Sequence, residues 1–283
     1  MKGEFLPGDA NAVLTKESAV RLGGCYRDIL EALPDLGSVY IQARNSGGGL
    51  GKTVSKFCPA TLEDEDFAID PDTGIAVSLS EWIGIHGGIL PFESERIPAL
   101  DFEFACFTSG LSLLEIPGLC DEGAIQDLAC RFFDSEITSE ELIEWRDTIE
   151  GQPDICPCCQ KASEIRAENV ESHPLYEICR QASLSGFELR FRIQAPHIDM
   201  VSAFAPSKVH ASNGFLVILP QTGDAAWHVD MRMVHSLRIS TIRMDGEKLG
   251  QLEIFDMFGN RNFQVTCDVP DIDAAWESIC RRG

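Results

Sequence analysis

The sequence predicts an α+β protein in which one unit, an antiparallel sheet flanked by helices, occurs twice in tandem. Three observations lead to this prediction. Short matching segments recur in the same order about 150 residues apart. Apolar residues alternate with polar ones, as in half-buried strands. Helix-like stretches bracket each run of strands, which is typical of α+β architecture.

An internal repeat determines the whole fold of a chain, because each copy is one structural unit. VSKFCPATL at 54–62 recurs as VSAFAPSKV at 201–209. The other matching pairs are Asp28–Gly37 with Glu177–Gly186, Pro71–Gly74 with Pro220–Gly223, Phe102–Phe104 with Leu252–Ile254, and Asp121–Arg131 with Asp271–Arg281. Five pairs in one order indicate a tandem duplication. We expect a first repeat at 1–134, a linker at 135–171 and a second repeat at 172–283.

Each repeat is expected to begin with a short amphipathic helix, near 25–34 and 174–183, and to continue with strands. In the second repeat Trp227, Val229, Met231 and Met233 alternate with His228, Asp230 and Arg232. This period of two predicts a strand with one buried and one polar face. Asp-Gly and Gly-Asn dipeptides further on predict hairpin turns.

Each repeat is also expected to close with a helix, capped by Asp121 in the first copy and by Asp271 or Asp273 in the second. The linker begins with an Ile, Leu and Trp stripe that predicts a helix, followed by QPDICPCCQ, a cysteine-rich loop. SGGGLGK at 46–52 lacks the glycine spacing of a phosphate-binding loop. It is therefore expected to be the flexible tip of a hairpin.

Composition excludes several classes of function. Among 283 residues, 23 basic side chains face 45 acidic ones, for a formal net charge of −22. Nucleic-acid binding needs clustered Lys and Arg, so an anionic ligand would be held by a few placed arginines. The chain contains no run of about 18 apolar residues, so it is not expected to span a membrane. The N-terminal residues lack a signal-peptide pattern, so the eleven cysteines are expected to be reduced thiols in a cytoplasm.

The order of several segments resembles a known family. HVDMRMVHSLRI at 228–239, LEIFDMFGNRNFQV at 252–265 and DIDAAWESI at 271–279 resemble the cytoplasmic haem-trafficking and hemin-degrading proteins of the HemS/ChuS type. LPDLGSVYIQARN at 33–45 and HPLYEICRQASLSGFELRF at 173–191 are similar to two further family segments. The resemblance implies a HemS-like fold, itself a tandem duplication of an α+β unit.

The resemblance also implies a haem site. It places the axial histidine on His173, the distal arginine on Arg44 and a second arginine on Arg232; His228, on the polar face of the same strand, is a weaker candidate. Neutral histidine ligates haem iron, and arginine binds carboxylates such as the propionates. Alternatives stay open for each residue: His173 as a surface residue at a helix start, Arg44 paired with a carboxylate, and Arg232 paired with Asp230.

The cysteines of the linker suggest a second chemistry. Cys156 and Cys159 form a C-x2-C pair, and His173 and Cys179 follow at a spacing that resembles a structural zinc site. Cys158 has no role in that pattern. Thiolate ligation of haem iron by a Cys-Pro dipeptide, redox chemistry and free thiols are the alternatives. Zinc and haem would compete for His173.

Two hypotheses of function follow. The first is a cytoplasmic haem-binding protein of haem and iron utilisation, which carries haem or degrades it in an oxygenase-like reaction. Its partners would be haem or another small anionic ligand, and a protein that donates or accepts haem. The second is a divergent, non-catalytic duplicate whose linker holds zinc and whose cleft binds a partner.

Overall fold

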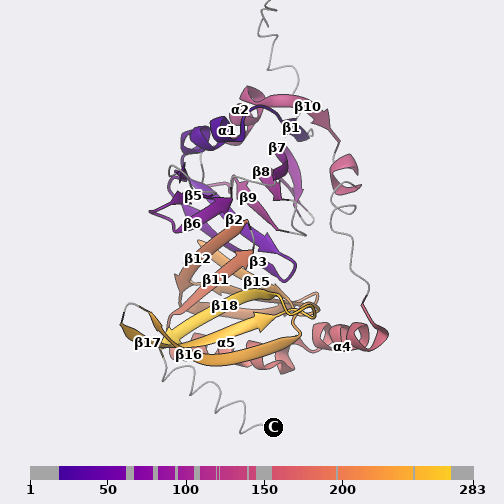
Figure 1. Ribbon diagram of the computed structural model, residues 1–283, viewed down its shortest axis with the longest axis vertical. Helices are drawn as coiled ribbons and strands as arrows, with labels where there is room; N and C mark the ends of the chain where they lie inside the picture. The colour runs from indigo at the N-terminus through magenta and orange to yellow at the C-terminus, as the bar shows by residue number, and fades with distance from the viewer. Residues whose placement is uncertain are drawn as a thin grey trace, which may run out of the picture.

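The computed structural model describes residues 19–61, 67–78, 82–92, 95–104, 109–118, 120, 122–138, 140–144, 155–195, 197–244 and 246–268. Two antiparallel sheets form its centre, and helices lie toward the two ends of the long axis (Figure 1). The helices α1 (Tyr26–Ala32) and α2 (Ala124–Arg131) lie at one end, and α4 (Pro157–Glu168) and α5 (Pro174–Ser185) at the other. This mixed, antiparallel arrangement agrees with the predicted fold class.

The first sheet has the strand order β10-β1-β7-β8-β9-β2-β3-β15-β14-β13. Its strands are β10 (Phe133–Ile137), β1 (Ala19–Leu22), β7 (Trp82–Phe92), β8 (Glu95–Phe104), β9 (Gly110–Leu114), β2 (Val39–Asn45), β3 (Gly48–Val54), β15 (Ala225–Asp230), β14 (Phe215–Pro220) and β13 (Pro206–Ser212).

The second sheet has the order β16-β17-β18-β11-β12-β6-β5-β4. Its strands are β16 (Ser236–Met244), β17 (Glu247–Phe255), β18 (Arg261–Asp268), β11 (Leu189–Ala195), β12 (Ile198–Phe204), β6 (Ile75–Ser78), β5 (Phe67–Asp70) and β4 (Ala60–Thr61). The predicted hairpin between β16 and β17 is present, with Met244 opposite Glu247.

The two strand orders correspond. When β7, β8, β9, β2 and β3 are matched with β16, β17, β18, β11 and β12, the remaining β15-β14-β13 falls on β6-β5-β4. Each sheet thus takes five matched strands from one half of the chain and three from the other, and β10-β1 extends the first sheet at one edge. The expected boundaries at 134 and 172 therefore do not separate the sheets.

Aromatic side chains join the two sheets. The ring of Trp227, on β15, lies 4.7 Å from that of Phe191 and 5.4 Å from that of Phe263, both on the second sheet. All three side chains are fully buried. Lys52, on β3, adds a polar link, because its Nζ donates to the carbonyl oxygens of Thr73 (2.6 Å) and Val201 (2.9 Å). The alternation predicted around Trp227 therefore marks the inter-sheet core.

That strand is shorter than predicted. β15 ends at Asp230, and residues 231–233 form a turn. The Asp230 carboxylate accepts a hydrogen bond from the Arg232 backbone N–H at 2.9 Å. An aspartate that bonds the backbone two residues later offers the chain a turn in place of a sheet ladder.

The helix caps differ from the predicted ones. The opening helices α1 and α5 lie where expected, but α2 has Gly123 at its N-cap and not Asp121. The Glu115 carboxylate caps this helix, accepting from the N–H groups of Gly123 (3.0 Å) and Ile125 (2.6 Å). The capping residues predicted for the second copy, 271 and 273, lie outside the described residues.

The linker also differs from its prediction. Residues 133–137 form strand β10, and a helical segment at 140–144 starts only after Thr138 and Glu141 cap each other reciprocally, at 2.8 and 3.1 Å. The cysteine stretch is the start of α4 and not a loop. Pro157 occupies the first helical position, where a missing N–H costs nothing, and Cys156 is the N-cap.

The glycine stretch is not a flexible tip. Only 46–47 form the turn, and Gly48–Val54 is a strand in the middle of the first sheet. A Cβ on Gly49 would lie 2.5 Å from the His228 ring, and one on Gly51 would lie 2.5 Å from the Tyr40 ring. The glycines therefore let large polar side chains lie close over this strand.

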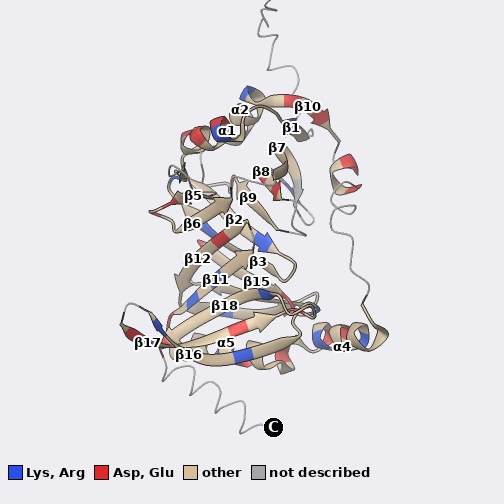
Figure 2. Cartoon of the chain, viewed as in Figure 1, with Lys and Arg blue, Asp and Glu red and all other residues tan. Residues whose placement is uncertain are grey.

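Along the ribbon, Lys and Arg positions are interspersed with Asp and Glu positions (Figure 2). Along the described chain, none of the helices combines the length and the apolar character that crossing a membrane requires.

Candidate functional site

His173 lies at the junction of the linker and the second half, where it is the N-cap of α5. Its Nδ1 accepts a hydrogen bond from the Leu175 backbone N–H at 3.2 Å. Burial, and then the charge of Arg166, lower the pKa of the imidazole to about 4, so His173 is neutral at neutral pH. The helix-start alternative is therefore what the structure shows. Neutral imidazole is also the form that ligates metals.

Capping α5 and ligating a metal through Nε2 require the proton of the neutral His173 ring on different nitrogens. While Nδ1 accepts from Leu175, the single proton of the neutral ring sits on Nε2. Ligation through Nε2 needs that proton on Nδ1, and the cap bond must then open. His173 can thus serve a metal only by exchanging its bond to Leu175 for a ligand bond.

Arg44, on β2, lies among acceptors contributed by β8 and β9. Its guanidinium donates to Ser112 Oγ at 2.9 Å, lies 3.5 Å from the Asp101 carboxylate and pairs with Glu103. The side chains of Asp101 and Glu103 are 1% and 10% exposed, against 21% for Arg44. The carboxylate alternative is therefore confirmed, and the charge of Arg44 is already balanced.

Arg44 and His228 are brought into one row across the first sheet. Consecutive cross-strand pairs join Glu103 to Gly110, Gly110 to Arg44, Arg44 to Gly49, and Gly49 to His228. Directly opposed residues share a face of a sheet, so the three large polar side chains lie on one face with glycines between them. Burial lowers the pKa of His228 to about 4, although Asp230 opposes this shift, so His228 is also neutral.

Arg232 lies just past the end of the same strand. Its Nε donates to the Asp230 carboxylate at 2.8 Å, which confirms the ion-pair alternative, and the guanidinium lies over the Phe215 ring at 5.3 Å. The side chain is 48% exposed. Helix α4 holds this turn, because Ser163 Oγ (2.8 Å) and Arg166 Nη2 (3.3 Å) both donate to the Arg232 carbonyl oxygen.

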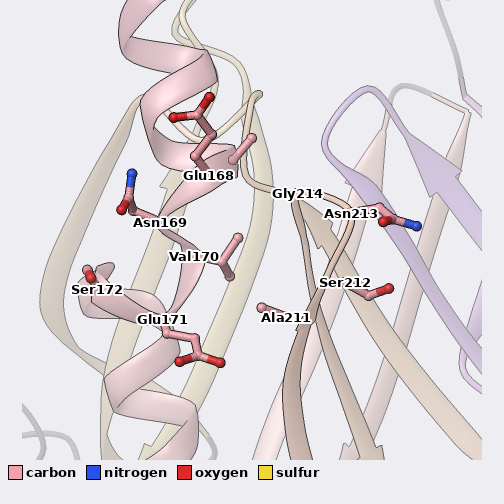
Figure 3. Close-up of a pocket in the computed structure, with 10 residues that line it drawn as sticks. Glu168, Asn169, Val170, Glu171, Ser172, Ala211, Ser212, Asn213 and Gly214 are labelled. Atoms are coloured by element: carbon pink, nitrogen blue, oxygen red, sulfur yellow. The ribbon is translucent and has the colours of Figure 1, made fainter.

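A cavity of about 470 Å³ is lined in part by residues 167–172, the segment that precedes His173 in the chain (Figure 3). It lies between the end of α4, the short helix η3 (Val170–Ser172) and the β13–β14 hairpin. Its lining residues are Ala167, Glu168, Asn169, Val170, Glu171, Ser172, Ala211, Ser212, Asn213 and Gly214. The volume falls in the usual range of small-molecule sites. Two glutamates line it, so this cavity favours the uncharged part of a ligand over its anionic groups.

The linker cysteines form a separate cluster. The thiol sulfurs of Cys156, Cys158 and Cys159 lie within 4.8 Å of one another, and the first two are 2.8 Å apart. Hydrogen bonds from Cys158 and Cys159 lower the pKa of Cys156 to about 7. Hydrogen bonding to Cys156 raises that of Cys159 to about 11.

The predicted four-ligand zinc set is not assembled. Of the described residues, the cluster contains Cys156 and Cys159 but neither His173 nor Cys179. His173 caps α5, and Cys179 is packed into the core, where burial raises the pKa of its thiol. Cys158, which had no predicted role, belongs to the cluster.

Sequence reasoning missed three residues that organise this region. Arg166 and Ser163 hold the turn of Arg232, and Phe215 lies between Arg232 and His228, its ring centroid 6.3 Å from that of His228. Phe215 carried a weak signal, since it opens an apolar run after an Asn-Gly turn. Arg166 and Ser163 carried none, because their partners are backbone carbonyls more than sixty residues away.

No protein-family model matches the chain, and no curated protein matches its sequence. Solved structures do match its fold. ChuS of Escherichia coli O157:H7, described as a heme degrading enzyme, has a TM-score of 0.66 at 13% identity over 93% of this chain and 87% of its own. A second ChuS structure, described as an E. coli heme oxygenase, has a TM-score of 0.65 at 16% identity over 92% and 88%.

A third similar structure is PhuS of Pseudomonas aeruginosa with its ligand bound, described as a heme-binding protein. It has a TM-score of 0.63 at 12% identity over 88% of this chain and 81% of its own. The resemblance predicted from the sequence is thus confirmed for the fold.

Proposed function

We propose that this chain is a cytoplasmic haem-binding protein of haem utilisation, either a carrier or a haem-degrading protein. The observation that carries the proposal is the shared fold with ChuS and PhuS over 88–93% of the chain. A protein that donates or accepts haem is the expected partner. The corresponding strand orders of the two sheets further support an origin by tandem duplication, with repeats at 1–134 and 172–283 and a linker at 135–171.

His173 and Arg232 fit two needs of haem, an axial ligand and a cation for a propionate. His173 supplies a neutral imidazole directly after a segment that lines the cavity, and the half-exposed Arg232 supplies a planar cation. Arg44 fits less well as a direct ligand, because Asp101 and Glu103 already hold it. We assign it the role of fixing the row that carries His228, the second candidate for the axial position. Bound haem would supply an iron centre with redox chemistry of its own.

Haem titration of the wild type and of His173→Asn tests the proposal. Asparagine is a good N-cap residue, so this variant keeps the α5 cap and loses only the imidazole. We expect the wild type to develop a Soret band saturating at a single equivalent of haem, and His173→Asn to bind at least roughly tenfold more weakly.

His235→Asn is the matched control, since His235 is an exposed histidine outside the site. It should titrate like the wild type. A loss of binding in His228→Asn but not in His173→Asn would move the axial position to His228. Absence of a Soret band in the folded wild type would refute haem binding.

The two neutral histidines also predict a pH dependence of stability. Their pKa values are about 4 in the folded protein and near 6.5 when unfolded, so above pH 6.5 neither state binds the proton. As the pH falls from 6.5 toward 4, the unfolded state binds protons first, and the free energy of unfolding decreases. The loss per histidine should be about 3 kcal/mol once the pH is well below 4.

Urea unfolding at several pH values checks this expectation. His173→Asn should show a shallower decline than the wild type between pH 6.5 and 4.5, a window above the ordinary carboxylate range. Parallel curves for the two proteins would contradict the assigned protonation of His173.

A further inference from the structure

We propose that Cys156, Cys158 and Cys159 form a three-thiolate site for cuprous ion, separate from the proposed haem site. The inference starts from geometry. Three of four consecutive residues contribute a sulfur, and the three sulfurs lie within 4.8 Å of one another. Among the described residues no other three His, Cys, Asp or Glu side chains gather in this way.

The start of α4 brings these thiols together. Cys156 is the N-cap, and Cys158 and Cys159 follow Pro157 in the first turn, so all three side chains lie around one helix end. Pro157 presets the backbone at the first helical position. The Cys159 N–H donates to Cys156 Sγ at 3.4 Å, which holds that sulfur toward the other two. The three donors are thus preorganised within one helical turn.

The ligand number decides which ion fits. A structural zinc site is closed by four protein ligands, but Cys179 is buried in the core and His173 caps α5, so neither joins the cluster. Thiolates are soft donors that favour Cu(I), zinc and iron–sulfur clusters, so the number of ligands has to distinguish between these. Cuprous ion is satisfied by three thiolates in a plane, so the cluster needs no fourth ligand.

Access and charge agree with this assignment. Cys156 and Cys158 are exposed and Cys159 is half-buried, so an ion can enter and leave from solvent. Three thiolates and one Cu(I) carry two net negative charges, and binding releases the thiol protons to solvent. The N-terminus of α4 carries a partial positive charge, and the guanidinium of Arg166 interacts with Cys159; both stabilise the negative charge of the site. An open site of this kind suits an ion that is passed on to another acceptor.

The test uses the full chain, reduced and kept under anaerobic conditions, with Cu(I) supplied from a chromogenic cuprous chelator that competes for the ion. We expect a single equivalent of Cu(I) per chain, with ultraviolet thiolate-to-copper absorption and three sulfur neighbours by X-ray absorption. Cys158→Ser and Cys159→Ser should each weaken binding by at least roughly 100-fold, more than loss of an outer-shell partner costs. Cys156→Ser keeps an N-cap oxygen for α4 and should weaken binding as strongly.

Cys25→Ser is the matched control, because Cys25 is an exposed cysteine at the start of another helix, and it should leave copper binding unchanged. His173→Asn should also leave it unchanged, which separates this site from the haem site. Copper binding that survives Cys158→Ser, or that falls in His173→Asn, would overturn the three-thiolate assignment. Failure of the reduced wild type to retain Cu(I), or tighter retention of Zn(II) in a parallel titration, would overturn the choice of ion.

Discussion

Replacing Arg44 with alanine is expected to lower the free energy of unfolding by about 3–5 kcal/mol, because it removes the guanidinium that two buried carboxylates contact. Asp101 is 1% exposed and Glu103 is 10% exposed, and both face the Arg44 guanidinium. Ser112 Oγ would also lose its donor at 2.9 Å. Urea or guanidinium unfolding of the purified variant measures the loss directly.

A double-mutant cycle tests whether uncompensated charge causes this effect. Glu103→Gln removes one of the two negative charges. The loss in free energy of unfolding in the double variant Arg44→Ala/Glu103→Gln should therefore be smaller than the sum of the losses in the two single variants. Arg131→Ala is the surface control, because its pair with Asp35 is 3.5 Å long and largely exposed. It should cost no more than about 0.5 kcal/mol. A loss of that size for Arg44→Ala would show that solvent reaches these carboxylates.

The elements of this fold could be predicted where their signals are local. Alternating residues identified the faces of β15, and an Asp-Gly turn identified the β16–β17 hairpin. The partners of the strands could not be predicted in the same way. β15 pairs on one side with β14 of its own half and on the other with β3 of the first half, and no periodicity encodes which strand lies alongside another. The exchange of strands between the halves was therefore invisible in the sequence.

The candidate site shows the same limit. Arg44 was identified from a family resemblance, but its fate depends on Asp101 and Glu103, more than fifty residues away. Carboxylates on β8, separated from β2 by β9, pair with the arginine. His173 was expected either to start a helix or to bind a metal. Its Nδ1 accepts the N–H of Leu175, so the imidazole that would bind the metal also caps α5. The local sequence identifies candidate residues, but contacts with distant parts of the chain decide which hydrogen bonds and ion pairs these residues form.

The cysteine cluster was misjudged for a local reason. The stretch was predicted to be a loop, but a proline is favoured at the first position of a helix. With α4 beginning at Pro157, Cys156 and Cys159 lie on the same end of a helix and Cys158 joins them. The start of the helix therefore groups three thiols, where the sequence spacing had predicted a zinc site with four ligands.

Gly48→Ala is expected to destabilise the fold by about 4 kcal/mol or more, among the largest effects that a single methyl group can have. Gly48 has φ +132°, a conformation that residues with a side chain rarely adopt. An added Cβ would overlap the His228 carbonyl oxygen on β15 and lie 3.0 Å from the carbonyl carbon. Backbone cannot rotate away as a side chain can, so β3 and β15 would have to separate at the centre of the first sheet.

Gly74→Ala separates the two causes of this loss. Gly74 also has a positive φ, +68°, but an added Cβ there would meet nothing within 4 Å. It should therefore show the conformational cost alone, about 1–2 kcal/mol. The difference between the two variants in chemical unfolding reports the contact between β3 and β15 together with the greater backbone strain at φ +132°. β3–β15 and β12–β6 are the pairs that join strands of the two halves. Equal losses would mean that these strands are not in close contact in solution, and the interleaving of the halves would then be in doubt.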